Sequence, residues 1–540
     1  MRPTTILRTL GPLALAAGGS FGALTGCIVL NPNHCAYSGD ACEEGLVCSK
    51  CAVDNDGCVP AVAVVDDQCF YVEGSSTAGP DTATTVQGST TVEPPTTGSA
   101  TVGDSSSTVD PTLPPVTSSE TTATSGEPPC DAAVVVDNPL CGGDAPYCLD
   151  GACVGCGELP SCAAVEPDKP ACEPGSGLCV GCVTSDDCDA VATPVCDTDL
   201  ATCVKCTEHE QCPETACNLA TGECFPPENI LYVNNTNNPD LNIDCDDTTG
   251  GATQAEPLCR LQKALAKIPV GVPTTIKLAP GSGQVFPASM MPGDRVVAIV
   301  PDGKVPSLVV DGMFSALSLS PGNQLFMYRV GIYNNSPLND PAIACDGARL
   351  WLDRQKIYNT RTAIAGDDCM IHVRRSVITG NVDGGVTLSG SVPGAATLWV
   401  ENSYITSNDG AVSGALTLSG EASAQLLYTT IAANGGPIAT IDCINWSGTL
   451  DLINSAVVDT SPLISATCMP NVSGTYTSAA NDPDPYKVFE GMLDGVFSAQ
   501  EGGALKGVAT WGGNLPRVDY NGDPRPTMEG AMDYAGADVP

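Results

Sequence analysis

Six phrases between residues 325 and 460 share one pattern and decide the fold. They read LFMYRVGIYNN (325–335), LWLDRQKIYNT (350–360), IHVRRSVITGN (371–381), LWVENSYITSN (398–408), AQLLYTTIAAN (424–434) and LDLINSAVVDT (450–460). Their central aliphatic residues are 25, 21, 27, 26 and 26 positions apart: Ile332, Ile357, Ile378, Ile405, Ile431 and Val457. The residues seven and five positions earlier are apolar in every copy, which is the period of a strand with one buried face. Such a repeat predicts a parallel β-helix over residues 227–540.

Two further columns of the repeat carry polar and aromatic side chains. Three positions after the aliphatic residue stand Asn335, Thr360, Asn381, Asn408, Asn434 and Thr460, which predict a hydrogen-bonded ladder along one turn. Six positions before it, on the outer face, stand Phe326, Trp351, His372, Trp399, Gln425 and Asp451. Outward aromatic rings predict an interaction site, with Trp351, His372 and Trp399 as glycan-binding residues. The alternative is that residues 471–540, which leave the repeat, cover this column.

Charged residues flank the aromatic column. Asp353, Arg374 and Glu401 share one outward position in three successive coils, and we expect them to contact ligand hydroxyl groups. A calcium cluster and a surface salt-bridge ladder are the alternatives, and one carboxylate on each side of an arginine favours the ladder. The acidic loop DCDDTTG (244–250) fits no EF-hand spacing. We therefore predict no cofactor and no metal ligand, with Ca²⁺ as the alternative.

Both ends of the β-helix resemble a known class. CRLQKALAKIP (259–269) has the apolar spacing of an amphipathic helix that caps the first coil. Together with YVNN (232–235), this segment resembles the entry of right-handed parallel β-helix proteins of the pectate-lyase-like class. DYNGDPRPTMEGAMDY (519–534) resembles the closing motif of choice-of-anchor Q β-helix domains. The resemblance covers residues 229–535 and implies a right-handed parallel β-helix and export, with no single activity.

One short run suggests an enzyme. AGDDCMI (365–371), with Asp367 and Asp368, resembles the G-D-D-C segment of polygalacturonases, in which paired aspartates act as acid and base. The upstream N-T-D and the G-H-G and R-I-K motifs of that family are absent from this sequence. Neighbouring side chains of a strand also point apart. The preferred interpretation is a polar turn between coils, and Asp367 and Asp368 remain weak catalytic candidates.

Cysteine spacing predicts disulfide-rich modules. Of 29 cysteines, 28 remain after Cys27, and they divide into six, sixteen and six along the chain. Residues 130–226 repeat the pattern C-x5-C-x(4–9)-C-x6-C from Cys156 on, with a variant first copy at Cys130, and resemble the Cys-rich repeats of myxobacterial surface lipoproteins. Zinc and redox sites are the alternatives, but an exported chain with even counts favours eight disulfides and no zinc. Three further pairs are predicted from spacing: Cys245–Cys259, Cys345–Cys369 and Cys443–Cys468.

The first 27 residues predict export. A short basic and then apolar segment ends in Leu-Thr-Gly-Cys, which resembles a bacterial lipobox with Cys27 as the lipidation site. An ordinary signal peptide is the alternative. Ile28 rather than Asp after this cysteine implies the outer membrane or the cell surface. Residues 28–73 form a Cys-rich module, and residues 74–129 have the composition of a disordered Thr/Ser/Pro/Gly linker.

Charge narrows the choice of partner. The formal net charge is −40, which excludes nucleic-acid binding through phosphates and disfavours polyanionic substrates. The sequence thus predicts small disulfide-rich modules and a disordered linker before a β-helix that a lipid anchor holds to the membrane. We expect this β-helix to present a binding surface, with glycans or a cell-surface polymer as ligand. A polysaccharide-degrading lyase or hydrolase and a purely structural surface element are the alternatives.

Overall fold

The computed structural model describes part of the chain. The described residues are 46–48, 58–60, 130, 136, 140–235, 245–280, 288–310, 315–334, 340–409, 413–459, 463–478, 488–493 and 495–540. Cys27 and the linker lie outside them, as do most of residues 28–73. Two compact units are distinguished, Met1–Val72 and Glu73–Pro540. In the first, β1 (Leu46–Cys48) pairs antiparallel with β2 (Cys58–Pro60). No helix of the described residues is long and apolar enough to cross a membrane.

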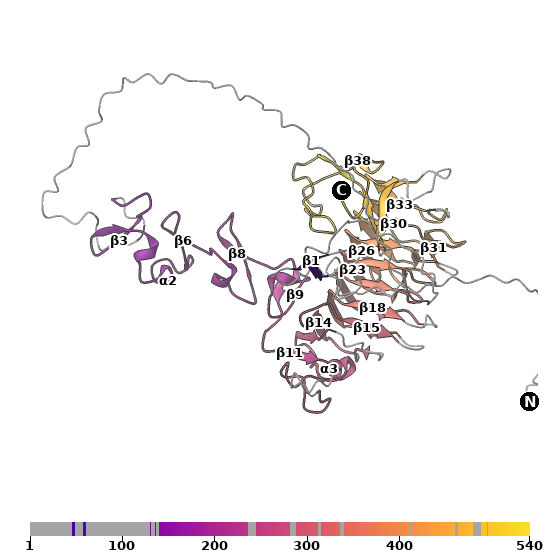
Figure 1. Cartoon of the computed structure of the whole chain (residues 1–540), viewed down its shortest axis with the longest axis horizontal. Helices are drawn as coiled ribbons and strands as arrows, with labels where there is room; N and C mark the ends of the chain where they lie inside the picture. The colour runs from indigo at the N-terminus through magenta and orange to yellow at the C-terminus, as the bar shows by residue number, and fades with distance from the viewer. Residues whose placement is uncertain are drawn as a thin grey trace, which may run out of the picture. The chain divides into compact units, whose positions relative to one another are not determined.

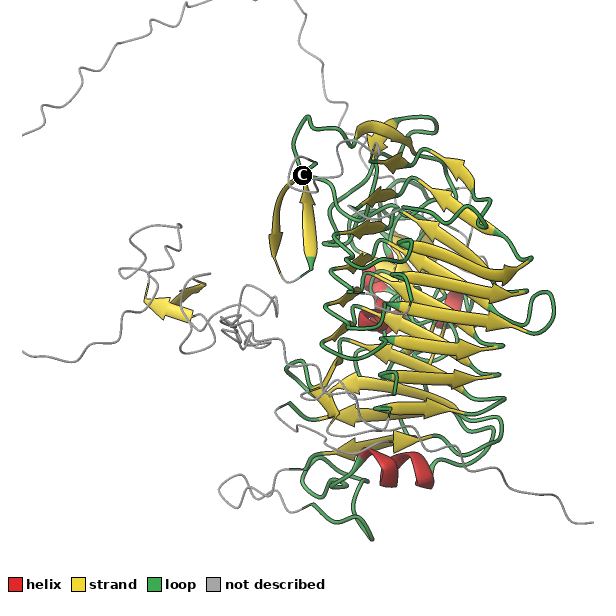
Figure 2. Cartoon of the chain, turned by 90° about the vertical axis from the view of Figure 1, so that its right-hand side faces the viewer, coloured by secondary structure: helices red, strands yellow, loops and turns green. Residues whose placement is uncertain are grey.

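Three parallel sheets build the β-helix, and Figures 1 and 2 show their strands stacked coil on coil. The ten-stranded sheet contains β11 (Ile230–Val233), β12 (Thr274–Leu278), β14 (Val296–Pro301), β17 (Gln324–Tyr328), β20 (Arg349–Asp353), β23 (Met370–Arg374), β26 (Thr397–Glu401), β29 (Ser423–Leu427), β32 (Leu450–Ile453) and β34 (Asn471–Ser473). The seven-stranded sheet contains β13 (Ala288–Ser289), β16 (Leu317–Leu319), β19 (Ile343–Asp346), β22 (Ile364–Asp367), β25 (Val386–Gly390), β28 (Leu416–Gly420) and β31 (Ile441–Trp446). The eight-stranded sheet contains β15 (Ser307–Val310), β18 (Gly331–Asn334), β21 (Lys356–Tyr358), β24 (Val377–Thr379), β27 (Tyr404–Thr406), β30 (Thr430–Ala432), β33 (Ala456–Val458) and β35 (Tyr476–Thr477).

The register of these sheets confirms the predicted parallel β-helix and the mainly β fold class. Each aliphatic position of one coil pairs with the same position of the next, as Leu350 pairs with Ile371 and Ile371 with Leu398. The inner side chains of all three sheets form one continuous core. Coils also precede the first predicted phrase, because β12, β14, β15 and β16 stack in the same way.

Turns and ladders fix each coil. Between the ten-stranded and the eight-stranded sheet, one residue of each coil takes a positive φ: Arg329, Arg354, Arg375, Asn402, Tyr428 and Asn454. The predicted polar ladder is present from Thr360 to Asn434. The Oγ1 of Thr360 donates to Asn381 at 2.6 Å, and the side-chain amide of Asn381 donates to Asn408 at 2.7 Å. Asn335 and Thr460 lie outside the described residues. After Asn434 the ladder ends at Asp459, whose carboxylate accepts a hydrogen bond from the backbone N–H of Asn434.

Two segments close the β-helix. The cap α3 (Leu261–Lys267) buries Leu261, Ala264 and Leu265 at the first coil, as predicted. At the other end lie the hairpins β36 (Phe489–Leu493) with β37 (Val496–Ala499) and β38 (Lys506–Thr510) with β39 (Met532–Tyr534). Phe497 of this segment packs with Tyr404 and Tyr428 outside the eight-stranded sheet. The C-terminal segment therefore packs on a sheet that does not carry the aromatic column.

The Cys-rich region consists of four small stapled units. Its elements are β3 (Tyr147–Leu149), β4 (Ala152–Val154), η3 (Cys156–Glu158), α2 (Cys162–Val165), β5 (Ala171–Glu173), β6 (Leu178–Val180), η4 (Ser185–Asp187), β7 (Val195–Asp197), β8 (Thr202–Val204), η5 (His209–Gln211), β9 (Cys217–Asn218) and β10 (Glu223–Cys224). Within each unit the first cysteine bonds the third and the second bonds the fourth, as in Cys206–Cys217 and Cys212–Cys224. All sixteen cysteines of residues 130–226 are bonded in this way.

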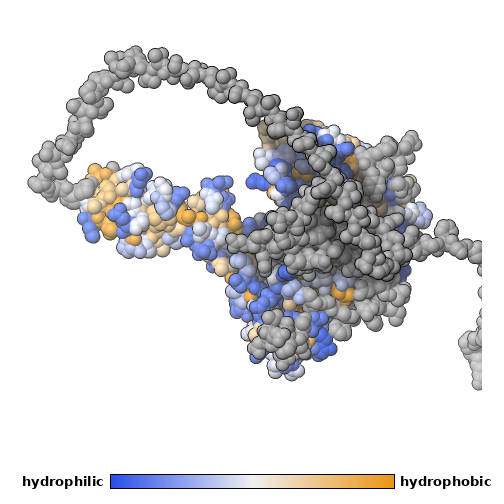
Figure 3. Space-filling view, viewed as in Figure 1, coloured by the Kyte–Doolittle hydropathy of each residue, from blue (hydrophilic) through white to orange (hydrophobic). Residues whose placement is uncertain are grey.

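These units have little core of their own. Figure 3 shows hydrophobic and hydrophilic residues side by side on their surface, and Leu140 and Leu200 are more than 60% exposed. Disulfides supply the constraint that a small core cannot. In the β-helix the structure also pairs Cys245–Cys259, Cys345–Cys369 and Cys443–Cys468, with Cα–Cα distances of 5.0, 6.2 and 5.3 Å.

Candidate functional site

The aromatic column lies on the ten-stranded sheet in the predicted order. The ring centroids of Phe326 and Trp351 are 4.3 Å apart, those of Trp351 and His372 5.6 Å, and those of His372 and Trp399 6.1 Å. The ring planes are within 18° of parallel. The rings therefore stack face to face along the β-helix axis. The stack is tightest at Phe326 and loosest at Trp399.

The fourth Cys-rich unit, residues 206–225, covers one end of this column. Phe225 packs edge-on against Phe326 at 5.7 Å, and Phe326 and Trp351 are buried beside it. Trp351 is 8% exposed and Trp399 is 39% exposed. The alternative in which residues 471–540 cover the column is therefore wrong in the described residues, since those residues pack on the eight-stranded sheet. Trp351 is therefore mostly covered, whereas Trp399 is open to solvent.

An ion-pair network holds the fourth unit against the sheet. Asp353 is fully buried and accepts hydrogen bonds from the Nη2 of Arg374 at 2.7 Å and of Arg375 at 3.1 Å. Arg375 also pairs with Glu208 of the fourth unit at 3.1 Å, and the Nη1 of Arg374 donates to the carbonyl oxygen of Thr207. Burial raises the pKa of Asp353, but the two guanidinium groups outweigh it and lower the pKa to about 2. Of the predicted ladder of Asp353, Arg374 and Glu401, the structure forms the Asp353–Arg374 ion pair, with Asp353 buried rather than at the surface.

A second set of contacts extends the same interface. The Tyr328 hydroxyl donates to Glu210 at 2.7 Å, and Arg354 forms an ion pair with Glu210. His209 is buried against Tyr328, with ring centroids 5.1 Å apart, and neither of its ring nitrogens has a hydrogen-bond partner in the described residues. Burial lowers the pKa of His209 to about 4. Cysteine spacing predicted the fourth unit only as a disulfide-rich module, and these contacts with the β-helix were not predicted.

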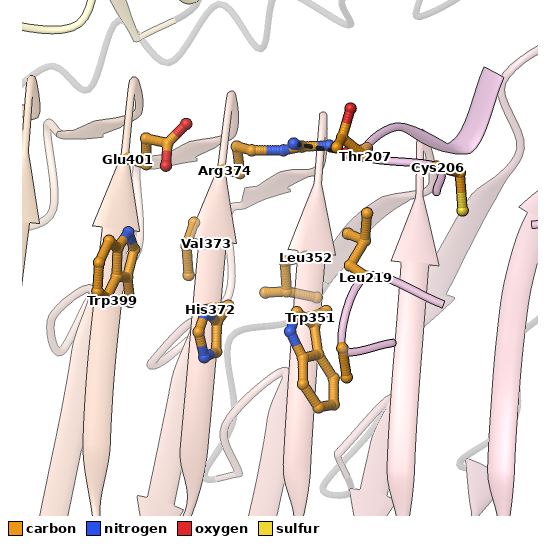
Figure 4. Close-up of a pocket in the computed structure, with 11 residues that line it drawn as sticks. Cys206, Thr207, Leu219, Trp351, Leu352, His372, Val373, Arg374, Trp399 and Glu401 are labelled. Atoms are coloured by element: carbon orange, nitrogen blue, oxygen red, sulfur yellow. Dashed lines mark hydrogen bonds between the residues drawn. The ribbon is translucent and has the colours of Figure 1, made fainter. Parts of the chain in front are cut away.

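Between the fourth unit and the sheet runs an open groove of about 550 Å³. One wall is the strand face with Trp351, His372, Trp399, Arg374 and Glu401, and the other is Thr207, Leu219 and Ala220 (Figure 4). Burial raises the pKa of Glu401, while the charges of Arg374 and Arg375 and a hydrogen bond with the Trp399 indole act in the opposite direction. Burial also lowers the pKa of His372, which favours its neutral form. The groove thus offers an indole, an imidazole and a carboxyl group side by side.

The remaining predicted residues lie elsewhere. Asp367 is exposed at the end of β22 in the seven-stranded sheet. Asp368 follows at φ 51° and accepts hydrogen bonds from the backbone N–H and the hydroxyl of Ser391, at 2.7 and 2.6 Å. These bonds lower the pKa of Asp368. A carboxylate held in this way forms part of a turn, the interpretation that the sequence analysis preferred.

The acidic loop after residue 243 is tied internally. Asp246 accepts hydrogen bonds from Thr248 and Thr249, and Asp247 forms an ion pair with Arg260. In the described part of the chain, every group of three or more His, Cys, Asp and Glu side chains at metal-binding distance consists of disulfide-bonded cysteines. The carboxylates of Asp246 and Asp247 are therefore engaged in hydrogen bonds and an ion pair within the protein.

Fold and groove together define a disulfide-rich parallel β-helix with a Cys-rich unit docked on one sheet. Residues 117–230, which include the four Cys-rich units, match the model of a family of unknown function (DUF8331). No curated protein matches the sequence. Among solved structures, a rhamnogalacturonan lyase is similar at 9% identity and a TM-score of 0.30, with 56% of this chain and 96% of that chain covered. A TM-score this low supports no statement about activity.

Proposed function

We propose that this protein is an exported, non-catalytic glycan-binding protein whose ligand lies in the groove between the fourth Cys-rich unit and the ten-stranded sheet. The observation that carries the proposal is the exposed Trp399 indole beside Glu401 in an open groove. Indoles are seldom left exposed in a well-packed fold, and an exposed one next to polar groups is typical of an interaction site. A sugar ring offers both the apolar C–H face and the hydroxyl groups that this pair can contact.

Trp399 is suited to this role because the stack leaves it less constrained than its neighbours. Trp351 is held between Phe326 and His372, whereas Trp399 is paired in register with His372 on one side and Gln425 on the other. A ligand can therefore contact the indole from the Gln425 side or along its edge. His372, neutral because of burial, and Glu401 can then bond hydroxyl groups at the same depth of the groove.

The alternative of a polysaccharide-degrading enzyme is less well supported. Hydrolysis of a glycosidic bond by acid–base catalysis requires two available carboxyl groups on either side of the bond. Glu401 is one carboxyl group in the groove, but Asp353, which shares its column, is buried and bonded to two arginines. Asp367 and Asp368 belong to the turn after a strand of another sheet. Binding without cleavage is the simpler use of this site.

A glycan array followed by titration calorimetry tests the proposal. Trp399→Ala is expected to lower the affinity for any glycan found in the array at least tenfold, which is the loss of about 1.4 kcal/mol of contact energy. Met528→Ala, which alters an exposed side chain of the C-terminal segment, is the control and should bind normally. Absence of binding to any glycan, or binding unchanged in Trp399→Ala, would contradict the proposal. Release of reducing ends from a bound polymer would favour the enzyme.

The proposed setting is the outer face of a bacterial membrane, where a lipid on Cys27 anchors the chain. The lipobox-like sequence and the disulfides support this setting, because structural disulfides persist in oxidising compartments. Metabolic labelling with a palmitate analogue should mark the wild-type protein and not Cys27→Ser. Labelling of both proteins, or of neither, would contradict the anchor while leaving the groove proposal untouched.

A further inference from the structure

The ion pairs of the docked interface leave one carboxyl group in the groove without a basic partner. Four basic residues of the β-helix face four acidic ones: Lys277 with Glu214, Arg354 with Glu210, Arg374 with Asp353 and Arg375 with Glu208. Glu401, which lines the groove, forms no ion pair with the described residues. The four basic and four acidic residues of the interface therefore balance in charge, and Glu401 is an additional acidic residue with no basic partner among the described residues.

Arg374, the nearest cation in register with Glu401, is already engaged. Its guanidinium donates to Asp353 and to the carbonyl oxygen of Thr207, at 2.7 and 3.0 Å. Figure 4 shows the Arg374 side chain reaching toward Thr207, while Glu401, on the neighbouring strand, lies on the side away from Thr207. Burial raises the pKa of Glu401, and the charge of Arg374 opposes this rise without forming a direct ion pair. A ligand cation can occupy the position that no arginine takes.

We propose that the groove selects a sugar that carries a positive charge, an oligosaccharide with free amino groups. This inference rests on the proposed glycan binding. An ammonium group placed between the Glu401 carboxylate and the Trp399 indole would gain an ion pair and a cation–π contact at once. The column continues through Gln425 and Asp451, which extend the row with an amide and a second carboxylate for hydroxyl and amino groups. A uronic acid would instead bring its carboxylate against Glu401.

The charge of the whole chain acts in the same direction. A formal net charge of −40 attracts cationic polymers and repels anionic ones over a distance of about 8 Å at physiological salt. His372, in its neutral form, adds no competing positive charge. The carboxyl group of Glu401, the Trp399 indole and the negative charge of the whole chain therefore all favour a positively charged ligand.

Titration calorimetry with three oligosaccharides of equal length tests this inference. They are oligomers of glucosamine, of N-acetylglucosamine and of galacturonic acid, compared on the full chain at a pH at which the glucosamine amine is charged. We expect the glucosamine oligomer to bind about tenfold more tightly than the acetylated one, and the galacturonate oligomer to bind most weakly. Glu401→Gln should remove the preference for glucosamine over N-acetylglucosamine oligomers. Both oligomers should still bind through contact with the Trp399 indole. Glu501→Gln, at an exposed position of the C-terminal segment, is the matched control and should keep the preference.

Each outcome decides between the two proposals. Equal or tighter binding of the acetylated oligomer, still lost in Trp399→Ala, would overturn the amino-sugar inference and keep the glycan-binding groove. Tighter binding of galacturonate would overturn it in the same way. A lysine hexapeptide that binds as tightly as the glucosamine oligomer, with the same dependence on Glu401, would replace the sugar with a basic peptide partner. No binding of any oligosaccharide would overturn both proposals.

Discussion

At the scale of single residues, Asp353 connects the two parts of the site. Its carboxylate is buried between Arg374 and Arg375, and Arg375 reaches Glu208 of the fourth Cys-rich unit. A buried charge is tolerated only while it is paired and hydrogen-bonded. The same carboxylate therefore holds Arg374 in the wall of the groove and Arg375 against the docked unit.

Asp353→Asn is predicted to destabilise the protein by about 3 kcal/mol, because it leaves Arg375 buried with one carboxylate fewer. Urea unfolding followed by circular dichroism measures this change. Glu166→Gln breaks the surface pair between Lys169 and Glu166 and serves as the control, with an expected loss of less than about 1 kcal/mol. Equal losses in the two variants would show that the Asp353 network contributes no more than a surface pair.

His209 is a second residue whose burial has a measurable consequence. Its folded-state pKa, about 4, lies below the ordinary value of 6.5, so the folded state binds fewer protons than the unfolded chain. The stability that depends on neutral His209 is present above pH 6.5 and is lost as the pH falls toward 4. Asp353 and Glu210 face the ring and oppose this shift, whereas Arg374 and Arg375 add to it.

His209→Phe is predicted to raise the melting temperature at pH 7, because it removes two buried nitrogen atoms that lack hydrogen-bond partners and keeps the ring against Tyr328. The gain over wild type should be larger at pH 4.5, where only the wild-type ring takes up a proton. Differential scanning calorimetry at both pH values measures this. A gain that is smaller at pH 4.5 than at pH 7 would contradict the assignment.

At the scale of elements, the closing segment after β37 contains a buried pair of aspartates. Asp519 accepts hydrogen bonds from the backbone N–H groups of Asn521, Gly522 and Asp523, and Asp538 accepts one from the side chain of Asn521. Burial, together with a hydrogen bond and the charge of Asp519, raises the pKa of Asp538 to about 8. Asp538 therefore keeps its proton at neutral pH.

The stability of this segment should fall as the pH rises. Because the folded-state pKa of Asp538 lies above its ordinary value of 3.8, the stability that depends on its proton is complete below pH 3.8 and is lost as the pH rises through 8. Asp538→Asn carries no titrating proton and should lose less stability than wild type between pH 5 and pH 9. Urea unfolding at the two pH values checks this prediction, and identical losses in both proteins would contradict it.

Periodicity made the elements predictable. The six phrases predicted the β-helix, the register of its columns and the polar ladder, because each coil repeats the same local requirements. The three cysteine pairs of the β-helix are also those expected from spacing. The coils around β12 and β14 lie within the predicted β-helix, but they were not identified as individual coils because they lack the phrase. A second ladder, in which the N–H of Ser376 donates to Ser403 and that of Thr429 to Ser455, was missed because serine and threonine are common in any turn.

At the scale of the whole molecule, the groove was the least predictable feature. The predicted boundary at residue 226 separates two parts that pack against each other through Phe225, Phe326 and the arginine network. No periodicity within either part encodes that contact. The acidic residues of the fourth unit and the arginines of the sheet are complementary, but the pairing is visible only once both surfaces are folded.

Two tryptophans of one column differ in accessibility: Trp351 is covered by the fourth Cys-rich unit, and Trp399 is open to solvent. Hydroxyl-radical footprinting with mass spectrometry, on the full chain with and without a saturating oligosaccharide, measures both indoles directly. We predict slow oxidation of Trp351 under both conditions, and fast oxidation of Trp399 that slows severalfold when ligand is bound. Equal oxidation of the two indoles without ligand, or no protection of Trp399 by a bound oligosaccharide, would contradict the account.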